Sequence, residues 1–254
     1  MKVVILAGGF GTRLSEETQI KPKPMIQIGG YPILWHIMNH YSKYGLNDFI
    51  ILLGYKGYMI KEYFVNYFLH NSDFTVNLEN NNIEILNKKS VNWKVTLLDT
   101  GLNSMTGARV KKAENHLNGE DFHLTYGDGL TDLDINELID FHERHGKTLT
   151  MTSSQPDGRF GALDIDGNKV LSFKEKPKGD GSWINAGYFI CKNSIFNYLN
   201  EREDLILEQE PLKNIALSGE LFTYKYDGFW MPMDSLRDKN KLEKMWKEKT
   251  APWK

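Results

Sequence analysis

The stretch Val3-Val4-Ile5-Leu6-Ala7-Gly8-Gly9-Phe10-Gly11-Thr12-Arg13-Leu14 decides the fold of this chain. It begins with five apolar residues that are bounded by glycine, a pattern typical of a buried parallel strand. A glycine-rich turn that carries a threonine and an arginine follows at once. Because glycine has no Cβ, backbone N–H groups in such a turn can approach an anion closely. The stretch therefore predicts a phosphate-binding loop at the carboxyl end of the first strand.

Two well-known phosphate loops do not match this stretch. A P-loop requires the pattern G-x-x-x-x-G-K-[ST], which does not follow Gly8. The dinucleotide fingerprint requires G-x-G-x-x-G, and its third glycine would fall on Leu14. A tight turn with an exposed arginine remains the alternative. The nearby run Lys21-Pro22-Lys23-Pro24-Met25 favours a triphosphate instead, because its lysines can neutralise several phosphate charges.

The composition limits the classes of protein that remain. The chain has 254 residues and is expected to form one domain, 1–254, with a surface excursion at 71–93 and a C-terminal helix and tail at 235–254. A formal net charge of −2 provides no basic field for nucleic acid. Cys191 is the only cysteine, so an internal disulfide is excluded. With neither a signal peptide nor a membrane-spanning stretch, we expect a soluble cytoplasmic protein that does not bind membranes.

Strands and helices alternate along the chain, which is the α/β pattern with a mostly parallel sheet. The 71–93 region breaks this rhythm, and its short apolar runs predict a protruding hairpin. A second hairpin is predicted around Asp166-Gly167-Asn168. The expected strands are 3–7, 49–53, 95–99, 122–126, 148–154, 184–188 and 221–226, and the expected helices are 33–44, 57–68, 106 onward, 135–145, 205–217 and 235–247.

Several polar residues follow the predicted strands, where open α/β sheets bind ligands. Asp128 lies between two glycines directly after strand 122–126, although an ordinary Asp–Gly turn would look the same. Asp234 ends an aromatic loop, and capping of helix 235–247 is the alternative for it. Thr106 is expected to cap the helix that carries Arg109. Asp134 is expected to cap helix 135–145.

The stretches Gly8-Gly9-Phe10-Gly11-Thr12-Arg13-Leu14 and Lys21-Pro22-Lys23-Pro24-Met25 resemble the opening motif of the sugar-1-phosphate nucleotidyltransferases, also called sugar-nucleotide pyrophosphorylases. The resemblance implies a Rossmann-like mixed, mostly parallel sheet with helices on both faces, a small sugar-binding β region and a C-terminal helix. It also implies Mg²⁺ as the cofactor, held by Asp128 and Asp234. Arg13, Lys23, Asp128 and Asp234 would carry the catalysis.

The same resemblance assigns roles to further residues. The motif Phe173-x-Glu175-Lys176-Pro177 and the strand motif Asn185-x-Gly187 match segments that hold the sugar and its phosphate in this family. Sugar-phosphate binding is therefore expected at Glu175, Lys176, Asn185 and Gly187. Nucleotide binding is expected at Leu6, Ala7, Gly8, Gly9, Gly11, Thr12, Arg13, Lys23, Ser104, Thr106, Gly107, Arg109 and Gly127.

Further stretches narrow the resemblance to the branch of the family that transfers a cytidylyl group to glucose 1-phosphate. They are 126–129, 159–163, 229–234 and the tail Ala251-Pro252-Trp253-Lys254. The substrates would then be CTP and glucose 1-phosphate, on a route to a dideoxysugar of a surface polysaccharide such as O-antigen, and a homo-oligomer is expected. A uridylyl- or thymidylyltransferase on the same fold is one alternative, and a catalytically inactive domain that binds nucleotide or sugar is another.

Overall fold

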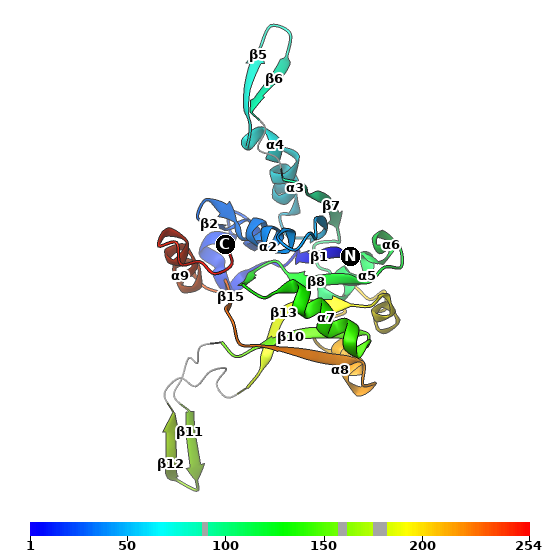
Figure 1. The fold of residues 1–254 in the computed structure, drawn as a ribbon, viewed down its shortest axis with the longest axis vertical. Coiled ribbons are helices and arrows are strands. Elements are labelled where there is room, and N and C mark those ends of the chain that lie inside the picture. The colour runs from blue at the N-terminus through cyan, green and yellow to red at the C-terminus, as the bar shows by residue number, and fades with distance from the viewer. Residues whose placement is uncertain (88–90, 157–161, 175–181) are drawn as a thin grey trace.

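The computed structural model describes residues 1–87, 91–156, 162–174 and 182–254. A seven-stranded sheet forms the centre of the molecule (Figure 1), in the order β14-β10-β13-β8-β1-β4-β7. Six of its strands run parallel, and β13 alone is antiparallel to both of its neighbours. The mixed, mostly parallel sheet that the sequence predicts is thus confirmed. The strands are β1 (Lys2–Ala7), β4 (Asp48–Leu53), β7 (Lys94–Asp99), β8 (Phe122–Tyr126), β10 (Leu149–Ser154), β13 (Ile184–Cys191) and β14 (Leu221–Tyr226).

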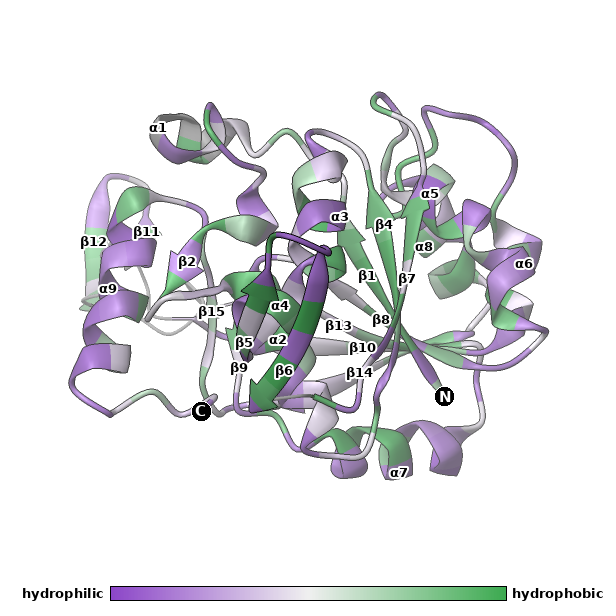
Figure 2. Ribbon diagram, turned by 90° about the horizontal axis from the view of Figure 1, so that it is seen from above, coloured by the Kyte–Doolittle hydropathy of each residue, from purple (hydrophilic) through white to green (hydrophobic). Residues whose placement is uncertain are grey.

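Helices cover both faces of the sheet because successive residues of β1 point to opposite sides. Val3 and Ile5 belong to one core with the helices α2 (Ile33–Ser42) and α7 (Ile135–His145). Val4 and Leu6 belong to a second core with α5, α6, η4 and α8. Figure 2 shows hydrophobic residues concentrated in the central strands, whereas α9 is mostly hydrophilic. The other helices are α3 (Gly57–Val65), α4 (Tyr67–His70), α5 (Thr106–Lys112), α6 (Glu114–Leu117), η4 (Asn193–Tyr198), α8 (Glu210–Leu217) and α9 (Leu236–Lys247), with the short η1 (Thr12–Leu14), α1 (Ser15–Thr18) and η2 (Lys23–Met25) near the N-terminus.

Two hairpins project from this body in opposite directions (Figure 1). The first pairs β5 (Asp73–Asn77) with β6 (Asn82–Asn87) and confirms the hairpin predicted in the 71–93 region. The second pairs β11 (Ala162–Asp166) with β12 (Lys169–Lys174), again as predicted. Two shorter pairs lie nearer the sheet. They are β2 (Gln27–Ile28) with β3 (Tyr31–Pro32), and β9 (Gly129–Thr131) with β15 (Trp230–Pro232).

The C-terminal tail is anchored to the body of the molecule. The Trp253 ring is 1% exposed and stacks on Phe229, with 5.4 Å between the ring centroids. Lys43 in the turn after α2 donates a hydrogen bond of 2.9 Å to the carbonyl of Trp253. Burial of an aromatic ring of this size stabilises the fold substantially, so the tail is part of the structure.

Three local predictions were wrong. The helix expected over 205–217 begins only at Glu210, because Pro211 lacks an N–H and fits only the first turn of a helix. The helix expected over 57–68 ends at Val65, where Asn66 donates both its backbone and side-chain N–H groups to the Glu62 carbonyl. Phe68 is consequently exposed. Thr106 is the first residue of α5 and does not cap it.

The helix cap expected at Asp134 was correct. The Asp134 carboxylate accepts hydrogen bonds from the backbone of Asn136 and Glu137 and so caps α7. Burial raises the pKa of the Cys191 thiol well above its ordinary value, which is consistent with an inert core residue. Every helix in the described ranges is too short or too polar to cross a membrane.

Candidate active site

A cavity of about 700 Å³ lies at the carboxyl edge of the parallel strands. The ends of β1 and β8 and the start of β13 form its floor, and the loop before α5 and the turn after β15 contribute to its wall. Most of the predicted site residues line it. They are Leu6, Ala7, Gly8, Gly9, Gly11, Thr12, Lys23, Ser104, Thr106, Arg109, Gly127, Asp128, Asn185, Gly187 and Asp234.

The description of the cavity lining does not extend to four of the predicted residues. Gly107 is buried in α5, where its N–H donates to the carbonyl of Leu205. Glu175 and Lys176 lie outside the described residues. Arg13 is in η1, next to the cavity-lining Thr12, and its side chain is not described. Binding roles for these four residues stay predictions.

Lys23 forms ion pairs with both aspartates of the predicted site. Its Nζ is 2.6 Å from Asp128 Oδ2 and 2.7 Å from Asp234 Oδ1. Burial lowers the pKa of Lys23, but attraction and hydrogen bonds to both carboxylates outweigh burial and leave this pKa raised. The lysine is therefore an ammonium ion at neutral pH. Asp128 and Asp234 are 106 positions apart in sequence, and the fold brings their carboxylates to one point.

Asp234 does not cap the helix that follows it. Ser235 occupies the capping position of α9 and forms a capping box with Asp238. The Asp234 carboxylate points instead toward Lys23 in the cavity. The structural alternative considered for Asp234 is thus wrong, and its carboxylate forms an ion pair with Lys23 in the cavity instead.

The two carboxylates could hold a hard divalent cation. Both direct an oxygen at the same positively charged atom, and carboxylate oxygens are preferred ligands of Mg²⁺. Mg²⁺ usually takes only one or two protein carboxylates and completes its shell with water and substrate phosphates. Within the described ranges there is no cluster of three or more histidine, cysteine or acidic ligands. The donor set therefore fits a metal that a substrate helps to bind.

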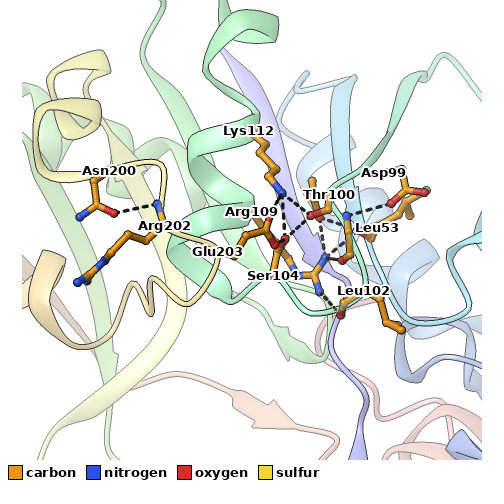
Figure 3. Close-up of polar contacts among 11 residues, drawn as sticks. Leu53, Asp99, Thr100, Leu102, Ser104, Arg109, Lys112, Asn200, Arg202 and Glu203 are labelled. Carbon is orange, nitrogen blue, oxygen red and sulfur yellow. Dashed lines mark hydrogen bonds and ion pairs between the residues drawn. The ribbon is translucent and has the colours of Figure 1, made fainter.

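The Arg109 side chain forms hydrogen bonds within the protein that the sequence did not predict. Its guanidinium donates to the carbonyls of Leu53 (2.8 Å), Gly101 (2.8 Å), Gly8 (3.0 Å) and Leu102 (3.2 Å). It also donates to the Thr100 hydroxyl at 2.6 Å, as part of the network in Figure 3. These acceptors belong to three separate loops at the edge of the sheet. The structure thus gives Arg109 the role of holding these loops together, and direct contact with a nucleotide stays a prediction.

Glycine at position 8 is required by this arrangement. A Cβ there would lie 2.4 Å from Cζ of Arg109, far inside van der Waals contact. The first glycine of the motif therefore allows the guanidinium to lie directly against the loop. This packing explains one glycine of the motif without any ligand.

Ser104 belongs to the same network. Its hydroxyl donates to Glu203 at 2.7 Å and accepts from Lys112 Nζ at 3.0 Å. Hydrogen bonds from Lys112 and Ser104 lower the pKa of Glu203. The loop before α5 is therefore tied to the 200–205 segment, as Figure 3 shows.

Tyr126 and Glu208 were missed by the sequence analysis. The Tyr126 hydroxyl donates to the Glu208 carboxylate and accepts from Asn185 Nδ2 at 3.2 Å. The other oxygen of Glu208 accepts from the Thr106 hydroxyl at 2.6 Å. Burial, with a smaller contribution from Glu208, raises the pKa of Tyr126. Glu208 thus connects Thr106, on the predicted nucleotide side of the cavity, to Tyr126 and Asn185 on the predicted sugar side. In the sequence, the only signal for either missed residue is the position of Tyr126 at the end of a predicted strand.

Phe10, Tyr188 and Trp230 also line the cavity without having been predicted as site residues. Phe10 is 46% exposed between the glycines of the loop, and its ring lies 5.3 Å from that of Tyr55. Trp230 lies on β15, and its buried indole N–H has no hydrogen-bond partner among the described residues.

The family model for nucleotidyl transferases matches residues 2–215. The chain belongs to this family. The nucleotidyl transferase is 55% identical over its full length to a glucose-1-phosphate cytidylyltransferase from Salmonella typhi, of which it covers 99%. It is 41% identical over its full length to a probable glucose-1-phosphate cytidylyltransferase from Bacillus subtilis, again covering 99%.

The fold is also similar to that of solved structures. The crystal structure of HddC from Yersinia pseudotuberculosis aligns with a TM-score of 0.71 and 26% identity, covering 96% of this nucleotidyl transferase and 99% of HddC. A UDP-glucose pyrophosphorylase in complex with UDP-glucose aligns with a TM-score of 0.69 over 98% of both chains. At 15% identity, the second comparison shows the shared fold alone.

Proposed function

We propose that this nucleotidyl transferase transfers a cytidylyl group from CTP to α-D-glucose 1-phosphate and releases CDP-glucose and pyrophosphate. The full-length similarity to glucose-1-phosphate cytidylyltransferases is the observation that carries the choice of substrates. The cavity supports the type of reaction, because it places a glycine-rich loop, Lys23 and two carboxylates at one edge of the sheet.

The reaction needs positioning more than acid–base chemistry. A phosphate oxygen of glucose 1-phosphate attacks the α-phosphorus of CTP, and the bond to the departing pyrophosphate breaks in line with the attack. Because the attacking oxygen is already anionic near neutral pH, no general base is required. The protein must instead hold two anions together and offset their repulsion.

We assign the positive charges accordingly. Arg13 and Lys23 would bind the triphosphate and stabilise the departing pyrophosphate. Lys176 would hold the attacking phosphate, and Glu175, Asn185 and the backbone at Gly187 would position the sugar. The hydrogen bond between Asn185 and Tyr126 supports this layout, because it fixes Asn185 in the wall of the cavity.

We propose Mg²⁺ as the metal ion, with Asp128 and Asp234 as its protein ligands. The family generally uses a divalent metal, and a bound Mg²⁺ would neutralise charge on the reacting phosphates. Support comes from the carboxylate pair, whose oxygens face the same cationic group, the ammonium of Lys23.

Pyrophosphate release measured with CTP, UTP, dTTP, ATP and GTP, at fixed glucose 1-phosphate and Mg²⁺, tests the proposed function. We expect CTP to be preferred, because a site that hydrogen-bonds the amino edge of cytosine leaves buried groups unpaired with uracil, which can discriminate by about 10⁴. Equal or faster release with UTP or dTTP would favour the uridylyl or thymidylyl alternative. Absence of release with all five nucleotides would favour an inactive binding domain.

We also propose that the chain forms a homo-oligomer through the β5–β6 hairpin. Phe74, Val76 and Ile83 on this hairpin are 38%, 42% and 47% exposed, and an isolated two-stranded hairpin is only marginally stable in water. Light scattering of a Phe74→Ser, Ile83→Ser double variant should give a smaller mass than the unaltered protein. A Leu217→Ser variant on α8 is the control, and an unchanged mass for the hairpin variant contradicts the proposal.

A further inference from the structure

Lys23 occupies the point where the two proposed metal ligands converge. Its Nζ is within 2.7 Å of an oxygen of each carboxylate, and its side chain is 12% exposed. Asp128 and Asp234 are 30% and 29% exposed, so both open toward the cavity. The lysine therefore acts as an internal cation for this carboxylate pair.

The backbone holds Asp128 and Asp234 close together. β9 and β15 pair with Gly129 opposite Pro232, so Asp128 lies one residue before this pair and Asp234 two residues after it. The N–H of Met233 also donates to the carbonyl of Asp128 at 2.8 Å. The backbones of Asp128 and Asp234 are thus tied to each other at one end of this small sheet. Lys23 is held less directly, because its long side chain can change rotamer while Pro22 and Pro24 keep its backbone in place.

A divalent cation and the Lys23 ammonium compete for the same two oxygens. If both were present, their positive charges would lie within a few ångströms of each other in a partly buried site, where repulsion is strong. The glycine-rich loop offers Lys23 another position. A Cβ on Gly11 would lie 3.2 Å from Cβ of Lys23, so the lysine stem runs beside the loop proposed to hold the triphosphate.

We propose that Lys23 is a displaceable cation that closes the metal site until a nucleotide arrives. In the free protein its ammonium group offsets one of the two negative charges of Asp128 and Asp234 and disfavours binding of metal alone. The triphosphate then draws the ammonium group to its own oxygens and frees the carboxylates, so metal and nucleotide bind together. This inference rests on the proposed function, because it assumes that these two aspartates hold the metal.

Binding of Mn²⁺ to the nucleotide-free protein tests the inference. Free Mn²⁺ is quantified by electron paramagnetic resonance for the unaltered protein and for Lys23→Met, which keeps the length of the side chain and removes its charge. We expect Lys23→Met to bind Mn²⁺ at least about tenfold more tightly, because the competing charge is gone. Lys21→Met, two residues away in the same motif, and Lys23→Arg, which retains the charge, should both bind as weakly as the unaltered protein.

A Lys23→Met, Asp128→Asn double variant tests whether the tighter Mn²⁺ binding occurs at the carboxylate pair. It should lose the gain in Mn²⁺ affinity if the metal binds at the carboxylate pair, and retention of the gain would overturn the inference. Circular dichroism checks that each variant is folded, and Lys23→Gln replaces Lys23→Met if the latter is not. Equal Mn²⁺ affinity of the unaltered protein and the uncharged variant also overturns the inference.

The same measurement in the presence of CTP separates this inference from the proposed function. If Mn²⁺ binds with CTP and turnover requires metal, equal affinities without nucleotide overturn only the role of Lys23. If turnover proceeds without any divalent metal, the metal assignment and the inference both fall.

Discussion

Replacing Arg109 with methionine should destabilise the protein even when no ligand is present. The guanidinium lies within hydrogen-bonding distance of five acceptors, four carbonyls and one hydroxyl, and the residue is 4% exposed. Hydrogen bonds to charged groups contribute about 1.5–3 kcal/mol each. The cost of burying the guanidinium offsets much of that sum. We therefore expect the free energy of unfolding to fall by about 3–5 kcal/mol, because several buried acceptors lose their donor at about 1–3 kcal/mol each.

Urea denaturation of the ligand-free protein measures this loss. Burial lowers the pKa of Arg109, but an arginine stays protonated throughout the accessible pH range, so the result should not depend on pH near neutrality. The transition midpoint should fall while its slope is unchanged. Arg202→Met is the matched control, because Arg202 is 56% exposed and forms surface ion pairs with Glu210 and Asp204. Its removal should cost less than about 1 kcal/mol.

The same variant distinguishes the two roles considered for Arg109. A residue that only contacts nucleotide would leave the stability of the ligand-free protein unchanged and raise the KM for CTP. A loss of less than about 1 kcal/mol for Arg109→Met, together with a raised KM, would refute the argument that this side chain holds the loops.

Other predictions address the metal ligands, the buried histidines and the sugar side. Asp128→Asn and Asp234→Asn should each lower kcat by about a hundredfold or more with unchanged circular dichroism, and near-normal turnover of both variants would contradict the metal assignment. Burial lowers the pKa of His123 to about 3 and that of His142 to about 4, so the unfolded chain binds more protons below its ordinary histidine pKa of 6.5. Stability should therefore fall as the pH drops from 6.5 toward 4, by roughly 1.4 kcal/mol per pH unit for each histidine, and urea titrations of His123→Leu should show a shallower fall. Gly187→Ala should lower the free energy of unfolding by about 1–3 kcal/mol and raise the KM for glucose 1-phosphate. The reason is that Gly187 has a φ of +78° and that a Cβ there would lie 2.3 Å from the ring of Tyr126. An unchanged urea midpoint for this variant would show that the neighbouring ring can move aside.

Local patterns in the sequence were sufficient for the architecture. The apolar run of β1, the alternation of strands and helices and the turn signals of both hairpins depend on contacts between near neighbours or on the period of the side chains. Helix ends were predicted less well, because the start of α8 and the end of α3 depend on a proline position and on an asparagine side chain. The glycine-rich loop and the lysine–proline motif likewise pointed to a nucleotide cavity before any contact was known.

Only the tertiary structure decided which polar residues work together. Lys23, Asp128 and Asp234 span 211 positions and meet because β1, β8 and the β9–β15 pair end at the same edge of the sheet. The sequence could equally make Asp234 a helix cap, and Ser235 proves to fill that position. Arg109 and Glu208 gain their roles from carbonyls and hydroxyls far away in the chain. Secondary structure follows from interactions between neighbours along the chain, whereas charge pairing depends on distances that exist only once the sheet has formed.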